Sequence, residues 1–244
     1  FVDWGWRYPF FVAFAINVVA LFARLRIVAS PEFDEMLNSS ELRPSRIRPT
    51  LRQDGRTMLL GIFMPLASFA MFHMVTIFPL SWRYLYSDNP PEAVLYSLLW
   101  GSLAGLLSII ASGYIADALG RRRLLMLGAV GIGVFAILGP LLLAAGREGA
   151  TIYIVLGFTL LGLSFGQSSG VIASLFGKKN RYTASALVAS LSWMIGAGFA
   201  PLTALSMSSA LGLWAAGIYL GSGVICTVVA IQMSRRGDME ITDE

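Results

Sequence analysis

The segment Gly113–Arg123, which reads Gly-Tyr-Ile-Ala-Asp-Ala-Leu-Gly-Arg-Arg-Arg, is a short charged turn between two long apolar stretches. Three consecutive arginines cannot lie in hydrocarbon, because each one costs roughly 2.5–3.5 kcal/mol at the centre of a spanning helix. The chain must therefore leave the membrane here, turn within a few residues and go back in.

The composition of the whole chain agrees with a membrane protein. Of the 244 residues, 56% are hydrophobic and only 13% are charged, and the mean hydropathy is +0.70. Soluble domains carry about 25% charged residues, so the deficit indicates that lipid surrounds most of this chain. The glycine content, 25 residues, is typical of membrane helices that pack closely.

Apolar stretches long enough to cross a bilayer, about 20 residues each, recur along the chain. They predict an all-α integral membrane protein with seven transmembrane helices. The predicted spans are roughly Tyr8–Leu25, Met58–Leu80, Ala93–Ile115, Leu124–Ala145, Ile152–Phe176, Ala184–Met207 and Leu213–Met233.

The basic residues alternate between the two sides of these spans. One side holds 15 of the 18 Lys and Arg residues, in Arg24–Arg56, Arg121–Arg123, Lys178–Arg181 and Arg235–Arg236. The positive-inside rule makes this side cytoplasmic, and it places the C-terminus inside and Phe1 outside. The same rule accounts for the pI near 9.5, so we expect no nucleic-acid partner.

The sequence lacks the residues of common catalytic and metal sites. Cys226 and His73 are the only cysteine and the only histidine, so no Cys/His metal site can be built from this chain. It contains no G-x-x-x-x-G-K-[ST] loop, and no nucleophile, base and orienting acid gather at membrane depth. We expect no enzyme, no metal and no cofactor, so an ion gradient would supply the energy for any transport.

Several polar and aromatic side chains within the spans are candidates for binding a substrate. His73 either lines a substrate or proton path or bonds to a neighbouring backbone carbonyl. Gln167 lies midway through the fifth span and needs a partner in lipid, either a ligand or another helix. Packing between helices is the alternative for the remaining candidates, which are Trp193, Phe72 and Asn17.

Glycine and proline mark two special regions of the predicted helices. Gly162, Gly166 and Gly170 form a stripe on one face of the fifth span, which predicts close helix packing. The sixth span contains a possible bending point, because proline removes a backbone hydrogen bond there. Its residues are Gly196, Gly198 and Pro201.

The segment Gly113–Arg122 resembles the signature of the major facilitator superfamily, roughly G-x-L-x-D-[RK]-x-G-R-[RK]. Ala118 departs from it, since the signature usually has a basic residue there. In that family the signature joins the second and third helices of each six-helix half, whereas here it joins the third and fourth spans. The resemblance implies that the seven spans are helices six to twelve of a twelve-helix transporter.

The resemblance also implies a role for the signature. In the family this cluster helps to hold the cytoplasmic gate shut against the other half of the protein. The implied gating residues are Gly113, Asp117, Gly120, Arg121 and Arg122. The glycines would allow close helix approach and a tight turn, and the alternative for the arginines is that they only set topology.

Two further parts of the chain are similar to the metabolite–proton symporter branch of that family. They are Trp6–Phe10 with the helix that follows, and Arg181–Leu187 followed by Ile195–Pro201. Members of the branch take up osmolytes such as proline and betaine, and organic acids such as shikimate, citrate and oxoglutarate.

The resemblance implies a division of the chain into four parts. Residues 1–26 would be the last helix of an N-terminal half, and residues 27–56 a cytoplasmic central loop with a short surface helix from about Ser30 to Leu42. Residues 57–234 would be the C-terminal six-helix half, and residues 235–244 a cytoplasmic tail. The other half is expected upstream of Phe1.

The expected function is secondary active transport of a small organic acid or zwitterion in a bacterial inner or plasma membrane. Proton symport and alternating access around a site near the bilayer midplane are implied. The expected partners are a small-molecule substrate, protons, the lipid bilayer and the N-terminal half. The alternatives are a receptor or scaffold that does not transport, and an efflux member of the superfamily.

Overall fold

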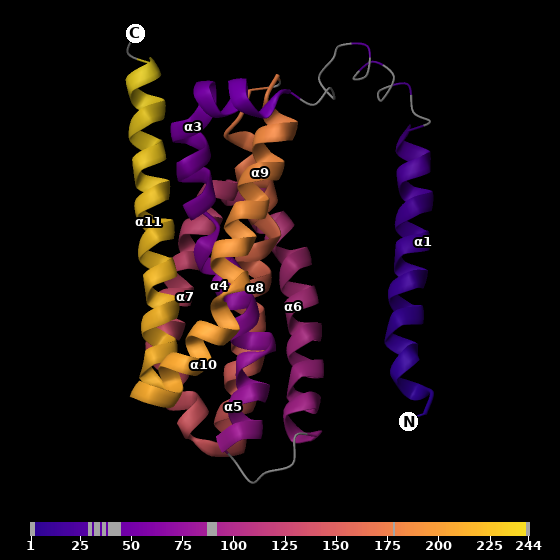
Figure 1. The fold of residues 1–244 in the computed structure, drawn as a ribbon, viewed down its shortest axis with the longest axis vertical. Helices are drawn as coiled ribbons and strands as arrows, with labels where there is room; N and C mark the ends of the chain where they lie inside the picture. Colours follow the sequence, from indigo (N-terminus) through magenta and orange to yellow (C-terminus); the bar gives the residue numbers. More distant parts are fainter. Residues whose placement is uncertain are drawn as a thin grey trace. The chain divides into compact units, whose positions relative to one another are not determined.

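The computed structural model describes residues 3–28, 31, 35, 38, 45–86, 92–177 and 179–242, with only the backbone described for residues 27 and 235–242. Two compact units, Phe1–Ser45 and Arg46–Glu244, make up the chain. In the first unit, a short 3-10 turn at Gly5–Arg7 leads into α1 (Tyr8–Val28), a single predominantly apolar helix. Figure 1 shows the ribbon of this helix.

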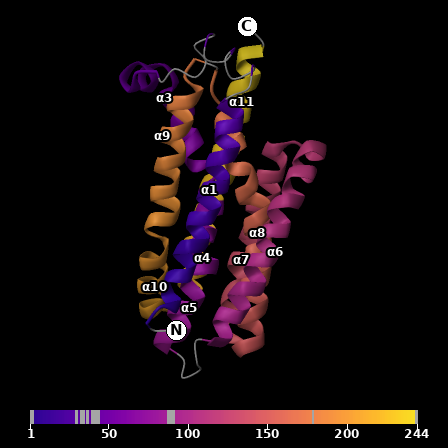
Figure 2. The same ribbon diagram turned by 90° about the vertical axis from the view of Figure 1, so that its right-hand side faces the viewer.

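The second unit is a helical bundle (Figure 1). Its elements in chain order are α3 (Ile47–Phe63), α4 (Leu66–Thr76), α5 (Phe78–Tyr86), α6 (Glu92–Leu119), α7 (Arg121–Ala144), α8 (Gly146–Ser174), α9 (Arg181–Trp193), the π-helical segment η2 (Met194–Gly198), α10 (Ala200–Leu211) and α11 (Trp214–Thr242). The bundle packs α6 and α7 against α8, α3 against α9, and α11 against α7 and α4 (Figure 2).

Seven helical stretches among the described residues are long and apolar enough to cross a membrane. They are Gly5–Arg26, Ile47–Tyr86, Glu92–Leu119, Arg121–Ala144, Gly146–Ser174, Arg181–Leu211 and Trp214–Ser234. The described residues form no strand. The prediction of an all-α membrane fold with seven spans is therefore confirmed.

Some boundaries differ from the sequence-based expectation. The second stretch begins at Ile47, within the predicted central loop. There a mainly polar segment and the apolar segment after it form one helix, α3, which ends at Phe63. The predicted surface helix between Ser30 and Leu42 falls on residues that, apart from three isolated positions, lie outside the described part of the chain. At the other end, α11 continues through most of the predicted tail.

Pro65 breaks the second stretch between α3 and α4, because proline has no N–H to continue the backbone bonding. Hydroxyl groups of two other helices bind the backbone groups left over at the break. The Ala67 N–H donates to Thr227 Oγ1 at 2.9 Å, and Thr227 in turn donates to the Phe63 carbonyl at 3.2 Å. Ser192 donates to the Ile62 carbonyl at 2.8 Å. Side chains of α11 and α9 therefore stabilise the backbone on both sides of this break.

In the glycine stripe of α8, Gly162 and Gly166 lie against α6, whereas Gly170 lies against Arg121 of α7. A Cβ added at Gly162 would lie 2.5 Å from the Gly105 carbonyl oxygen and 2.7 Å from Ser108 Cβ. A Cβ at Gly166 would lie 2.5 Å from Ser112 Oγ. Helices gain little in lipid from burying apolar surface, so close backbone contact of this kind contributes to their association. The prediction of tight packing along the stripe is confirmed.

The core of the bundle gathers at the centre of α4, α7 and α8. Met71 and Met74 of α4 and Ile132 of α7 are fully buried there. Tyr153 of α8 is buried among them, and its hydroxyl donates to the Met74 carbonyl at 2.9 Å. This bond satisfies the one polar atom of a large side chain that is otherwise surrounded by apolar groups.

Candidate functional site

The signature turn is a single residue. α6 ends at Leu119 and α7 begins at Arg121, so Gly120 alone reverses the chain. Its φ of 85° is in the left-handed region that glycine adopts without strain. The Gly120 N–H donates to the Ala116 carbonyl at 2.8 Å, and Leu124 donates back to the Gly120 carbonyl at 3.1 Å. The turn therefore joins the two helices without a flexible loop.

Two signature arginines reach neighbouring helices from the start of α7. A Cβ added at Gly170 of α8 would lie 2.8 Å from a terminal nitrogen of Arg121, so that guanidinium lies on the glycine. Arg122 donates to the Ile231 carbonyl of α11 at 2.7 Å. Both arginines also line an open groove of about 600 Å³ together with Ile231. The arginines thus connect α7 to α8 and α11 in addition to any effect on topology.

Gly113 and Asp117 lie one turn apart on an exposed face of α6. A Cβ added at Gly113 would meet no atom within 4 Å, so the close approach expected at this glycine does not occur within the described part of the chain. Within these residues α6 packs on α8 through its other face, at Gly105 and Ser108, and a gating contact at Gly113 stays a prediction. Asp117 likewise makes no hydrogen bond or ion pair with another described residue.

An aromatic cluster brings three predicted site residues together. It consists of Phe69, Phe72 and His73 on α4, Phe165 on α8 and Trp193 at the end of α9. The ring centroids of Trp193 and Phe72 are 5.1 Å apart, and those of Trp193 and Phe69 are 5.3 Å apart. Phe165 lies 6.1 Å from Trp193, so rings of three helices meet at one place.

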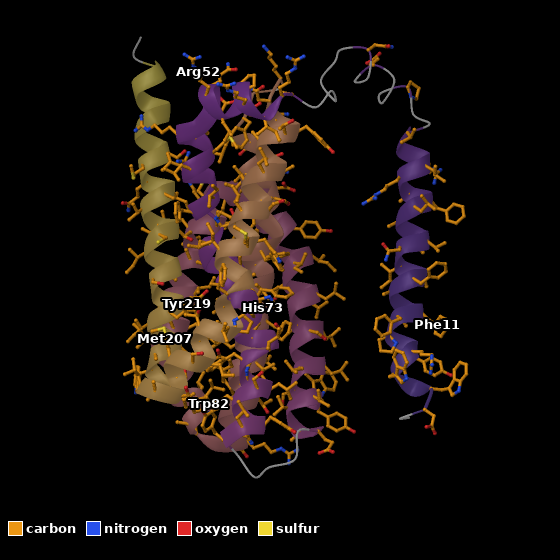
Figure 3. All side chains as sticks on the ribbon, in the orientation of Figure 1. Phe11, Arg52, His73, Trp82, Met207 and Tyr219 are labelled. Carbon is orange, nitrogen blue, oxygen red and sulfur yellow. The ribbon has the colours of Figure 1, made fainter. Side chains whose placement is uncertain are left out.

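His73 is half-buried and lies between the two ends of the bundle (Figure 3). Its Nδ1 is buried and has no hydrogen-bond partner among the described residues. The ring contacts Phe72 edge-on at 5.1 Å, and its centroid is 6.1 Å from that of Trp193. The structure thus shows His73 among rings, and which of its two predicted roles applies, lining a path or bonding to a backbone carbonyl, stays open.

Sequence reasoning missed Phe69 and Phe165. A helical spacing of three and four residues places Phe69 on the same face as Phe72 and His73, so periodicity could have found it. Nothing in the sequence indicates that Phe165 faces α4, because that depends on how α8 is rotated against its neighbours.

Gln167 lies on another side of α8 from Phe165, and Asn17 belongs to the first unit of the chain. Gln167 is buried, and its Nε2 donates to Ser112 Oγ of α6 at 3.0 Å. It therefore faces α6, whereas Phe165 on the same helix faces the aromatic cluster. Asn17 is exposed on α1 in the first unit and donates to the Ala13 carbonyl, one turn earlier, at 2.9 Å. Roles for these two residues in binding a substrate stay predictions.

The sixth span is interrupted directly after Trp193. The π-helical segment η2 runs from Met194 to Gly198, and α10 begins at Ala200. Gly196 lies tightly on α4, since a Cβ there would be 2.9 Å from Phe69 Cβ, and the Tyr219 hydroxyl donates to its carbonyl at 3.3 Å. π-Segments are frequent at functional sites.

The two other residues of the predicted bending point differ from Gly196. A Cβ at Gly198 would meet no atom within 4 Å, and Pro201 occupies the first turn of α10, where it breaks no hydrogen bond within that helix. Bending in this region during function stays a prediction.

The fold and its seven apolar helical stretches define an α-helical integral membrane protein. Residues 1–201 match the sequence model of the Major Facilitator Superfamily, and the chain belongs to that superfamily. The superfamily consists of transporters, which agrees with the prediction that the protein is not an enzyme.

The chain is similar to several curated bacterial proteins. It is 26% identical over 240 residues to the inner membrane metabolite transport protein YhjE of Escherichia coli K12, covering 96% of this chain and 54% of the relative. It is 28% identical over 250 residues to a putative metabolite transport protein of Haemophilus influenzae, covering 96% and 56%. A proline/betaine transporter of Escherichia coli K12 is 28% identical over 224 residues, with 84% and 43% covered.

The chain spans about half the length of the curated relatives it matches. No solved structure matches it.

Proposed function

We propose that the protein is a secondary active transporter that takes up a small organic acid or zwitterionic metabolite together with protons across a bacterial inner membrane. The observation that carries this proposal is the signature turn at Gly120, which α6 and α7 form within a chain that matches the superfamily over residues 1–201. Relatives whose names describe metabolite or proline/betaine transport support the substrate class.

The mechanism in the proposal is alternating access, in which two helical halves rock around a site near the bilayer midplane. The bundle from α3 to α11 would be one half, with its C-terminus in the cytoplasm. The aromatic cluster around His73 would be its contribution to the substrate site, because that cluster lies away from both ends of the bundle (Figure 3). The other wall would come from an N-terminal half.

The exposed side of the signature supports a gate between the halves. Gly113 offers a surface without a side chain, and Asp117 one turn later is a carboxylate without a described partner. A helix of the other half could approach α6 closely at Gly113 and present its N-terminus or a cation to Asp117. In this proposal the contact forms when the cytoplasmic side is closed and breaks when it opens.

The test is uptake by cells that express the full-length gene product, with labelled proline, glycine betaine, shikimate, citrate and oxoglutarate. We expect one of these compounds to accumulate above the level in cells without the gene, and a protonophore to abolish the accumulation. Accumulation that survives the protonophore but requires a sodium gradient would contradict proton coupling and leave transport standing.

Two other outcomes would point to the alternatives. Export of a preloaded compound would indicate an efflux protein. Binding without movement in either direction, measured by thermal stabilisation of the purified protein, would indicate a receptor on the same fold.

A further inference from the structure

The Trp193 ring packs against other aromatic rings and is still partly exposed. Phe72 and Phe69 contact it edge-to-face, with interplanar angles of 64° and 69°, and Phe165 contacts it from α8 at 67°. Despite these contacts, 38% of the Trp193 surface is exposed. An exposed aromatic side chain that already packs against three neighbours loses less conformational entropy when a ligand binds it than a free one would.

The helices that carry the aromatic cluster place no formal charge near it. The Asp, Glu, Lys and Arg residues of α4, α8 and α9 occur only in first turns, at Arg147, Glu148 and Arg181. Trp193 is more than three helical turns from Arg181, and Phe165 is more than four turns from Glu148. A substrate at the cluster would meet aromatic rings and one imidazole, but no guanidinium or ammonium group of these helices.

These surroundings favour a positively charged substrate group over a negatively charged one. The faces of aromatic rings carry negative electrostatic potential and attract cations, most strongly at tryptophan, and aromatic groups recognise quaternary ammonium ligands in this way. A di- or tricarboxylate needs basic side chains or several hydrogen-bond donors, which the cluster does not supply.

We propose that Trp193, together with Phe72, binds the ammonium group of a zwitterionic substrate, so that the transported metabolite carries a quaternary or secondary ammonium rather than only carboxylates. This inference rests on the proposed function and narrows its substrate class. The substrate carboxylate would then be bound elsewhere, outside the aromatic cluster. Because η2 begins at the next residue, a change in that segment would also change how the Trp193 ring is presented.

The test compares two ligands of the same shape. Glycine betaine carries a trimethylammonium group, and 3,3-dimethylbutanoate has an uncharged tert-butyl group in its place. In the full-length transporter, we expect glycine betaine to compete for uptake at least about tenfold better than 3,3-dimethylbutanoate, which keeps the carboxylate but lacks the positive charge. The Trp193→Leu variant should raise the apparent KM for the ammonium substrate about tenfold and remove this discrimination, whereas Trp193→Phe should have a smaller effect because a ring remains.

Trp100 provides a matched control. It is an exposed tryptophan on α6, outside the aromatic cluster, with 62% of its surface accessible. Trp100→Leu should change neither the KM nor the discrimination between the two ligands. Equal amounts of monodisperse protein for the three variants would show that folding is not the cause of any difference.

Two results would overturn the inference while leaving transport intact. One is accumulation of citrate or oxoglutarate with no transport of, or competition by, any ammonium compound. The other is a Trp193→Leu variant in which the binding of glycine betaine and of 3,3-dimethylbutanoate is weakened equally, which would mean that Trp193 makes only an apolar contact.

If nothing accumulates, the proposed function fails, and direct binding decides the inference separately. Thermal stabilisation of the purified full-length protein by glycine betaine, lost in Trp193→Leu, would support the ammonium site on a protein that does not transport. Absence of stabilisation would overturn both proposals.

Discussion

The Thr227 hydroxyl of α11 accepts a hydrogen bond from the backbone N–H of Ala67, at 2.9 Å, directly after the proline that breaks the second span. In an unbroken helix this N–H would bond to the carbonyl of Phe63, four residues earlier. Thr227 occupies the position between the two groups, since it also donates to that carbonyl at 3.2 Å. One side chain thus replaces a missing helical hydrogen bond from a different helix.

Removing this hydroxyl should weaken the bundle. We expect Thr227→Val to cost about 1 kcal/mol, because the Ala67 N–H is buried and would lose its partner, while Thr227→Ser should keep most of the stability. The measurement is the midpoint of thermal unfolding in detergent. Ser222→Ala is the control, since Ser222 is exposed on the same helix and bonds only to the Tyr219 carbonyl. An unchanged midpoint in Thr227→Val would show that the break needs no support from α11.

Substitution by alanine should have opposite effects on stability at a glycine in the α6–α8 contact and at a glycine in open space. Gly162→Ala should destabilise the protein by a few kcal/mol or prevent its accumulation, because the new Cβ meets the Gly105 carbonyl, which is backbone and cannot turn away. Gly221→Ala on α11 should be neutral or stabilising by up to about 1 kcal/mol, since nothing lies within 4 Å and alanine is the better helix former. Expression and thermal unfolding of the two variants give the comparison. Equal behaviour would refute the close packing.

A side chain at Gly120 should strain the backbone without creating a steric clash. Gly120→Ala should cost about 1–2 kcal/mol, because a φ of 85° disfavours every residue with a Cβ although the space around it is open. Gly113→Ala, also in open space but within a regular helix, should not lower stability. Thermal unfolding separates the two effects. A loss of stability in Gly113→Ala comparable to that in Gly120→Ala would argue against backbone conformation as the cause.

The proposed gate predicts a loss of transport without a loss of stability. Asp117→Asn should slow uptake about fivefold or more in the full-length protein, because the gate contact would lose its charge. The midpoint of thermal unfolding of this variant should equal that of the wild type, since Asp117 is exposed and bonds to no other described residue. Glu148→Gln, an exposed acid near the start of α8, is the matched control and should transport normally. Uptake at the wild-type rate in Asp117→Asn would remove Asp117 from the gate.

Much of the architecture is determined by the sequence alone, because lipid imposes strong local rules. A span needs about 20 apolar residues, and three adjacent arginines cannot remain in hydrocarbon. Both requirements can be read along the chain without knowledge of packing. They were sufficient for the seven spans and for the turn at Gly113–Arg123, and the four-residue spacing of the glycines predicted the close contact at Gly162 and Gly166. The resemblance carried by that turn also indicated the superfamily.

The tertiary structure decided which side chains meet, because helix rotation and register bring together residues that are far apart in the chain. Gln167 donates to Ser112 of α6, although the sequence left both a ligand and another helix open as its partner. Gly113 lies on an exposed face of α6, although a close helix contact was expected at the signature glycines. The aromatic cluster needs α4, α8 and the end of α9 in one place, and no local pattern includes Phe165. The hydrogen bond that stabilises the break at Pro65 joins Ala67 and Thr227, which are 160 positions apart. Such contacts depend on the packing of whole helices, which apolar periodicity along one segment does not specify.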